Sequence, residues 1–138
     1  MADFLKFIPS IITDEGFITK DKNDKGGLTI WGLTKVADAK WSGWNLVNQY
    51  IAKNPVYPYG LYEVKDKLYE MSRPYYKAEY WDSIRADEIN SQMLADQYCD
   101  IGIIQGVPTA IHNMQDSMGV PRASSVSDDL INKLNAGI

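Results

Sequence analysis

The sequence predicts a mainly α protein of the α+β class, with one small β-hairpin or loop directly after its first helix. Apolar residues recur at three- and four-residue intervals along most of the 138 residues, which is typical of amphipathic helices. One short segment, Leu28–Leu33, follows the pair Gly26–Gly27 and instead suits a strand or hairpin arm. A chain of this length suits one core, so we expect residues 1–138 to form a single domain.

The first predicted helix ends on a carboxyl group, because its apolar stripe continues onto Glu15. Asp3 can cap its start, Gly16 can take the left-handed conformation that ends helices, and Pro9 predicts a kink or a later start. A carboxyl among apolar neighbours loses hydration, which raises its pKa and makes it a general acid near neutral pH. The alternative is a surface Glu at a helix end. The stripe consists of Phe4, Phe7, Ile8, Ile11 and Ile12.

A second carboxyl and a hydroxyl follow in a glycine-rich loop. Asp24 lies nine residues after Glu15, and Thr29 lies five residues after Asp24. A tight turn at Gly26–Gly27 would bring both side chains back toward Glu15 across a cleft. Such a set suits cleavage of a glycosidic bond: Glu15 would protonate the leaving oxygen, Asp24 would stabilise positive charge on the sugar, and Thr29 would hold a water. The alternative is that Asp24 and the glycines serve only the turn.

Several other site chemistries are excluded. The segment 21–26 resembles the start of a calcium-binding loop, but the fifth and twelfth loop positions fall on Lys25 and Gly32, where an oxygen ligand and a Glu are needed. The single Cys99 rules out an internal disulfide and a multi-cysteine metal site, and its apolar neighbours predict a buried structural thiol. The single His112 argues against a zinc amidase or a serine triad. We therefore expect no metal and no cofactor.

Helices are predicted for most of the remaining chain. Residues 45–53 form one helix, and the segment 54–60 forms a rigid loop because it holds two prolines and a glycine. A longer helix follows over 62–79, which Pro74 can kink. Three further apolar faces predict the central helix of the core, a helix closed by Gly119 and a last short helix. They consist of Ile89, Met93, Leu94, Tyr98 and Ile101; of Ala110, Ile111, Met114 and Met118; and of Val126, Leu130 and Leu134.

Four tryptophans and nine tyrosines are many for this length. Aromatic rings line sugar clefts because the apolar face of a pyranose packs on a ring. Trp31 is the first candidate for such a contact, because it lies inside the glycine-rich loop. The next candidates lie in loops or near helix ends, and they are Trp41, Trp44, Tyr57 and Tyr59. Core packing is the stronger interpretation for Tyr75, Tyr76, Tyr80 and Trp81.

Charge and hydropathy limit the partners. The net charge is −4 and no basic stripe with interleaved aromatics is visible, which argues against nucleic acid. No apolar run is long enough to cross a membrane, so we expect no membrane insertion. Lys6, Pro9 and Asp14 interrupt the first apolar stretch, which is therefore a poor secretory signal. We expect a monomer that is made in the cytoplasm and needs separate export or release to act outside it.

The run DEGFITKDKNDKGGLTIWGLT, residues 14–34, resembles the N-terminal signature of the glycoside hydrolase family 108 muramidases. In this resemblance Glu15 falls on the family's catalytic acid. The spacing is also similar to the Glu, Asp and Thr set of phage-type lysozymes. Loop positions that match the signature are Asp24, Gly26, Gly27, Thr29, Gly32 and Thr34. The resemblance implies a lysozyme-like fold and hydrolysis of the bond between N-acetylmuramic acid and N-acetylglucosamine in peptidoglycan glycan strands, with Thr34 among the substrate-binding residues.

The C-terminal half resembles the same family more loosely. Residues 75–84 are similar to its aromatic segment, and residues 94–120 to its peptidoglycan-binding region. Phe17 and Ile104 depart from the family pattern, as does the tail after Pro121. The resemblance thus divides the domain into a catalytic half, 1–85, and a helical half, 86–138.

Three functions remain open on the sequence. The leading one is a peptidoglycan hydrolase, either inverting or retaining according to the separation of its carboxylates. A lytic transglycosylase would use the same acid and leave an anhydro sugar end. A non-catalytic wall-binding or secretion-associated protein could use the same scaffold, but it has no need for a protonated carboxyl at position 15.

Overall fold

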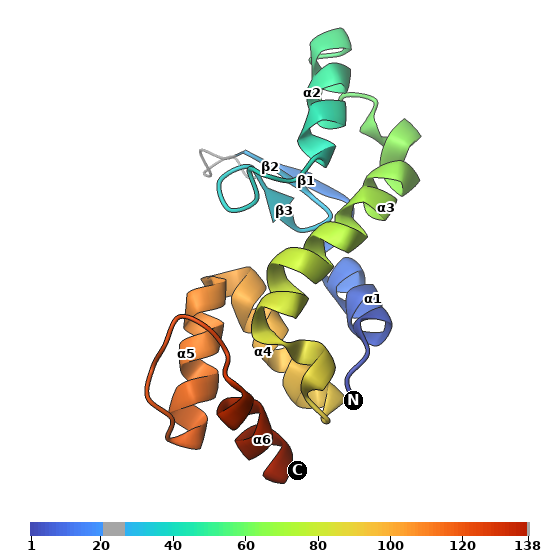
Figure 1. Ribbon diagram of the computed structural model, residues 1–138. Helices are drawn as coiled ribbons and strands as arrows, with labels where there is room; N and C mark the ends of the chain where they lie inside the picture. Colours follow the sequence, from blue (N-terminus) through green and yellow to red (C-terminus); the bar gives the residue numbers. More distant parts are fainter. Residues whose placement is uncertain (21–26, 138) are drawn as a thin grey trace. The chain divides into compact units, whose positions relative to one another are not determined.

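The computed structural model describes residues 1–20 and 27–137, and the side chains of residues 10–15 lie outside that description. The described part is mainly helical and contains a small three-stranded antiparallel sheet, which confirms the predicted fold class (Figure 1). The helices are α1 (Phe4–Glu15), α2 (Gly43–Lys53), α3 (Lys65–Tyr76), α4 (Gln92–Gln105), α5 (Val107–Met118) and α6 (Asp128–Ala136). The strands are β1 (Ile18–Lys20), β2 (Leu28–Ile30) and β3 (Leu33–Thr34). Short 3-10 or π turns are η1 (Leu61–Val64), η2 (Lys77–Trp81), η3 (Asp82–Ile84) and η4 (Ala86–Glu88).

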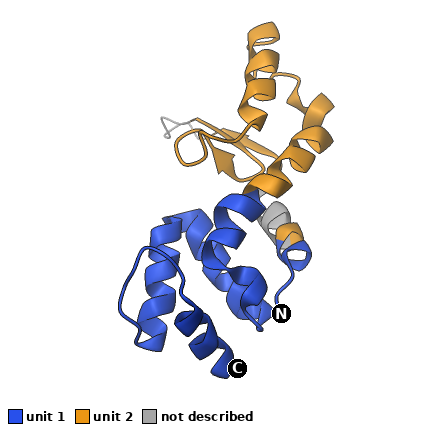
Figure 2. Cartoon of the chain, in the orientation of Figure 1, with its two compact units in different colours: residues 1–7, 76–138 blue, residues 8–75 orange. Residues whose placement is uncertain are grey.

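The chain forms two compact units (Figure 2). Unit 1 consists of residues 1–7 and 76–138, and unit 2 consists of residues 8–75. The single domain with halves 1–85 and 86–138 stays a prediction. The candidate residues Glu15 to Tyr59 all belong to unit 2, so the site is described within that unit.

The first helix begins and ends as the sequence predicts. Asp3 Oδ1 accepts a hydrogen bond from the backbone N–H of Leu5 at 3.0 Å, which confirms the cap. Pro9 lies inside α1, which begins at Phe4, so the later helix start that Pro9 could have caused is wrong. Gly16 follows the helix with a φ of 68°, the conformation expected of a residue that ends a helix.

The sheet has the order β1-β2-β3, and a two-residue turn joins β2 to β3. Ile30 pairs with Leu33 across this turn, and its two residues, Trp31 and Gly32, have φ values of 48° and 81°. Positive φ at both positions is what a type I′ hairpin turn requires. A small β-hairpin after the first helix is confirmed, with β1 as an additional strand. The single strand or arm expected over 28–33 is wrong, because the turn at Trp31–Gly32 divides that segment into β2 and β3. Of the predicted turn at Gly26–Gly27, the first glycine lies outside the described residues.

The two predicted helices that follow the sheet in the chain lie close to their predicted positions. The helix predicted over 45–53 is α2, which begins two residues earlier. The helix predicted over 62–79 is present as η1, α3 and η2 in succession. Pro74 lies inside α3, and the change to π geometry comes after it, at Lys77.

In unit 1, α5 packs on α4, and this contact corrects the predicted buried face of α4. Met93 is 65% exposed, and the buried residues are instead small: Ala95, Cys99 and Gly102. A Cβ at Gly102 would lie 3.8 Å from the Cβ of Ala110 on α5. Small side chains allow the two helices to approach closely, and a face of small residues does not appear in the sequence as a stripe of large apolar residues. Burial raises the pKa of the Cys99 thiol, and the predicted structural thiol is confirmed.

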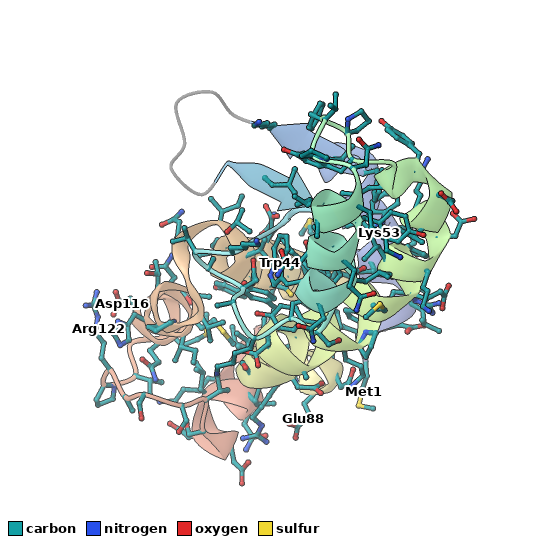
Figure 3. All side chains as sticks on the ribbon, turned by 90° about the horizontal axis from the view of Figure 1, so that it is seen from above. Met1, Trp44, Lys53, Glu88, Asp116 and Arg122 are labelled. Atoms are coloured by element: carbon teal, nitrogen blue, oxygen red, sulfur yellow. The ribbon has the colours of Figure 1, made fainter. Side chains whose placement is uncertain are left out.

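Aromatic rings are buried in the remainder of unit 1. The indole of Trp81 packs on Phe4 and Phe7 with ring centroids 5.6 and 5.4 Å apart, and Tyr76 is fully buried, as predicted. After α5, Arg122 donates two hydrogen bonds to the carboxylate of Asp116, at 3.0 and 2.7 Å (Figure 3). This pair ties the segment after Gly119 back to α5. The last helix, α6, buries Leu130 and Leu134 as expected.

Candidate active site

A row of three threonines crosses one face of the sheet. The register pairs Thr19 with Thr29 and Thr29 with Thr34, and directly opposed residues of an antiparallel sheet share a face. Thr19 is exposed, while Thr29 and Thr34 are half-buried. The alternate residues Ile30 and Leu33 are fully buried, so the other face carries the core. The row Thr19–Thr29–Thr34, called here the hydroxyl row, therefore faces away from the core of unit 2.

The end of α1 is tied to the same sheet. Glu15 is the last residue of α1, and two residues later the carbonyl of Phe17 accepts a hydrogen bond from the N–H of Trp31 at 2.6 Å. Trp31 itself follows Thr29 by two residues. The backbone thus passes from the end of α1 to the sheet within two residues, beside the end of β2. The side chain of Glu15 lies outside the described residues, as does the whole of Asp24, so the roles of both stay predictions.

A buried carboxylate bonds to the backbone of Thr34, the member of the hydroxyl row on β3. Asp38 is 3% exposed, and its Oδ2 accepts a hydrogen bond from the backbone N–H of Thr34 at 3.0 Å. Its Oδ1 accepts from the phenol of Tyr75 on α3, also at 3.0 Å. The backbone N–H of Asp38 donates to the carbonyl of Thr34 at 2.7 Å, and its own carbonyl accepts from the indole N–H of Trp44 at 2.9 Å. Asp38 thereby joins β3 to both α2 and α3.

Neither Asp38 nor Tyr75 was among the candidate site residues of the sequence. One local signal was present: the hydroxyl of Thr34 accepts from the N–H of Ala37 at 3.2 Å, a turn typical of a Thr followed closely by Asp. That pattern predicts a turn, but it does not reveal the partner on α3. Only the fold places Tyr75, 37 residues further along the chain, against this carboxylate.

The three candidate tryptophans are packed into unit 2. Trp31 is 7% exposed and Trp41 is 2% exposed, and their indole N–H groups donate to the carbonyls of Lys65 and Met71 at 3.1 Å. Trp44 is 5% exposed. Indoles with covered faces and bonded nitrogens serve the core, which argues against direct stacking on a sugar. A role for them in binding substrate stays a prediction that this burial disfavours.

The two candidate tyrosines are more accessible. Tyr57 is 41% exposed and Tyr59 is half-buried, and their rings pack edge to face with centroids 5.7 Å apart. The phenol oxygen of Tyr59 lies 3.5 Å from the Nζ of Lys20, the last residue of β1. Of the aromatic candidates, these two therefore offer ring surface to a ligand.

Within residues 1–20 and 27–137, no cluster of His, Cys, Asp or Glu side chains could hold a metal ion. No helix of that same part is long and apolar enough to span a membrane. The hydroxyl row itself offers three hydroxyl groups, which can bind and orient water or sugar hydroxyls.

Most of the chain matches a known protein family. The model of the family described as Glycosyl hydrolase 108 matches residues 8–106. A solved structure titled "Structure of Brucella abortus SagA" is similar to the chain with a TM-score of 0.71 and 22% identity, over 96% of this chain and 68% of that chain. At this identity the likeness shows the fold alone, and it supports the lysozyme-like fold that the resemblance implied. A comparison with curated proteins gave no match.

Proposed function

The chain belongs to glycosyl hydrolase family 108, and we propose that it hydrolyses peptidoglycan between N-acetylmuramic acid and N-acetylglucosamine. Family membership makes the protein a glycoside hydrolase and supports the glycan strand as its substrate. The observation that carries the proposal is the extent of the family match. Residues 8–106 include the end of α1, the glycine-rich loop and the complete hydroxyl row.

In the proposed mechanism Glu15 is the general acid. It protonates the leaving glycosidic oxygen as the sugar gains oxocarbenium character, and Asp24 stabilises that charge. This role requires the Glu15 carboxyl to lie among apolar neighbours, because desolvation favours its neutral form. The separation of the carboxyl groups of Glu15 and Asp24 determines whether the reaction inverts or retains configuration.

The hydroxyl row would position the water. Thr29 is the central member, with Thr19 and Thr34 directly opposite it on the two neighbouring strands. Each hydroxyl can donate one hydrogen bond and accept two, so the row can hold a water and still bond a sugar hydroxyl. Asp38 fixes the backbone of Thr34, and this contact supports the edge of the row.

The test is digestion of purified peptidoglycan by the wild type and by Glu15→Gln, with mass analysis of the soluble fragments. We expect the wild type to release fragments with reducing muramic acid ends, and Glu15→Gln to lose nearly all turnover while it keeps its helical circular dichroism. Glu70→Gln is the matched control, because Glu70 lies exposed on α3 in a surface pair with Arg73. Thr29→Ala should lower turnover less than Glu15→Gln does.

Three other results would contradict parts of this proposal. Full activity of Glu15→Gln would remove Glu15 as the acid. Anhydro ends in place of reducing ends would make the protein a lytic transglycosylase. Wall binding without any soluble fragment from the wild type would favour a non-catalytic protein.

A further inference from the structure

Unit 2 contains a pocket of about 310 Å³ between the C-terminal end of α2, the loop 54–60 and η1. This volume is at the lower limit of the range for small-ligand sites, so one small chemical unit fits it. We propose that the pocket binds a single acetamido sugar residue of a glycan strand and acts as a second sugar site. The proposal rests on the proposed function for its substrate class.

The pocket does not belong to the hydroxyl row. Tyr59, which lines it, contacts Lys20 through its phenol oxygen. Lys20 follows Thr19 in β1, and successive side chains of a strand point to opposite faces. The contact therefore reaches β1 from the face opposite the hydroxyl row. A sugar in the pocket would bind alongside the sheet and away from the position proposed for the attacking water.

Two aromatic rings from different elements line the pocket. Tyr50 comes from α2 and Tyr59 from the loop, and both are half-buried. The exposed ring of Tyr57 packs against Tyr59 at 86° and supports its orientation. Partly exposed, supported rings are suited to the apolar face of a pyranose.

The backbone at Tyr59 is held in an unfavourable conformation. Its φ is 64°, in the left-handed region that bulky residues rarely adopt, and its N–H donates to the carbonyl of Val56 at 2.6 Å. Gly60 follows with a φ of 71°, so two successive residues are left-handed and only the second is glycine. A tyrosine at a position suited to glycine indicates that the ring itself is needed there.

The polar groups of the pocket match an uncharged amide-bearing ligand. Gln49 and Asn54 contribute carboxamides. The Oδ1 of Asn54 accepts from the N–H of Val56 at 3.3 Å, and its Nδ2 lies toward Gly60, 3.8 Å from where a Cβ would be. This orientation leaves the NH₂ group on the pocket side, where it can donate to an acetamido carbonyl or a hydroxyl.

The two charged residues of the pocket have opposite signs. Lys53 ends α2, at the other end of that helix from Trp44, and Glu63 lies in η1 (Figure 3). One cation balanced by one carboxylate is a poor site for phosphate, which clusters of cations bind. Both side chains can instead bond sugar hydroxyls, and this balance favours a neutral sugar over an anionic ligand.

The experiment is an NMR titration of the isotope-labelled Glu15→Gln protein with tetra-N-acetylchitotetraose. The signals followed are the backbone amide of Gly60 and the side-chain amides of Gln49 and Asn54. We expect these signals to shift with one dissociation constant. Tyr59→Gly should weaken that binding by about tenfold or more, the equivalent of about 1.4 kcal/mol, while Tyr59→Phe should keep it.

Two controls separate binding from folding. Tyr59→Gly removes the unfavourable φ, so its thermal midpoint should stay close to that of the parent protein, or rise. Gln49→Ala should weaken binding, whereas Gln97→Ala, at an exposed position of α4, should leave it unchanged. A purely structural role for Tyr59 predicts the reverse: a lower midpoint with unchanged binding.

The outcomes distinguish this inference from the proposed function. If the wild type digests peptidoglycan but tetra-N-acetylchitotetraose leaves the pocket signals unmoved, the second site is refuted and the hydrolase stands. If the pocket signals shift but no digestion occurs, the site stands and the hydrolase falls. Shifts with a free stem tripeptide and none with tetra-N-acetylchitotetraose would overturn the assignment to a sugar.

Discussion

Replacing Asp38 by alanine should remove the carboxylate that joins β3 to α3. Its side chain is almost fully buried and accepts hydrogen bonds from the N–H of Thr34 and the phenol of Tyr75, both at 3.0 Å. Hydrogen bonds to a charged group contribute about 1.5–3 kcal/mol each, and the two donors would lose their buried partner. We therefore expect Asp38→Ala to lower the free energy of unfolding by about 3–5 kcal/mol, a large share of a typical total of about 5–15 kcal/mol.

Three further variants separate the contributions of the two hydrogen bonds to this loss of stability. Tyr75→Phe deletes only the phenol oxygen, so it should cost about 1–2 kcal/mol. Asp38→Asn keeps the shape and one acceptor oxygen for Thr34, so it should cost less than alanine does. The double variant Asp38→Ala/Tyr75→Phe should cost less than the sum of the two single changes, because both remove the same bond.

The assay is urea unfolding followed by tryptophan fluorescence, with the same denaturant slope required of every variant. Digestion of peptidoglycan should also slow in Asp38→Ala, since Thr34 lies directly opposite Thr29. A loss of stability below about 1 kcal/mol for Asp38→Ala would refute the reasoning. Removal of a buried carboxylate that accepts two hydrogen bonds should lower the free energy of unfolding by more than that. Additive costs in the double variant would show that the bond to Tyr75 contributes nothing.

Three further predictions concern other parts of the chain. Gly43→Ala should destabilise by about 1–3 kcal/mol in urea unfolding, because the new Cβ would overlap the ring of Trp41; stabilisation, the usual effect of this change in a helix, would contradict that packing. Gly16→Ala should cost about 1 kcal/mol because its φ is 68°, and an unchanged urea midpoint would show that the helix end adapts. Arg85 donates to Glu88 at 2.6 and 2.7 Å and lowers the pKa of that carboxyl, so the pair's stabilisation is present above the ordinary Glu pKa and lost as pH falls through the folded value. Thermal midpoints measured between neutral and acid pH should therefore fall less in Arg85→Met than in the wild type, and equal slopes would refute the linkage.

Local pattern predicted most of the fold correctly. The cap at Asp3, the hairpin after α1 and the glycine that ends α5 each depend on neighbouring residues, so their signals are complete within a few positions of sequence. The burial of Cys99 followed from its apolar neighbours in the same way. The buried face of α4 was predicted only in part, because the small residues that meet α5 produce no apolar stripe.

The features of the candidate site also differ in whether neighbouring residues were enough to predict them. Residues close together in the chain, Glu15 through Thr34, could be grouped by spacing and by family resemblance, and that grouping stays a prediction. Their alignment as a hydroxyl row required the register of three strands. The burial of Trp41 and Trp44 was not visible in sequence, where a ring in a loop looks equally suited to a cleft wall or to the core.

By itself, then, the sequence determined the order and type of the elements, the family, and the segment where the chemistry is expected. The tertiary structure alone decided that Asp38 meets Tyr75, that three indoles are covered, and that Tyr50 and Tyr59 share a pocket. The physical reason is the distance along the chain over which each kind of interaction acts. Capping, turn conformation and helix periodicity act over a few residues, whereas hydrogen-bond partners and burial depend on segments that only the folded chain brings together.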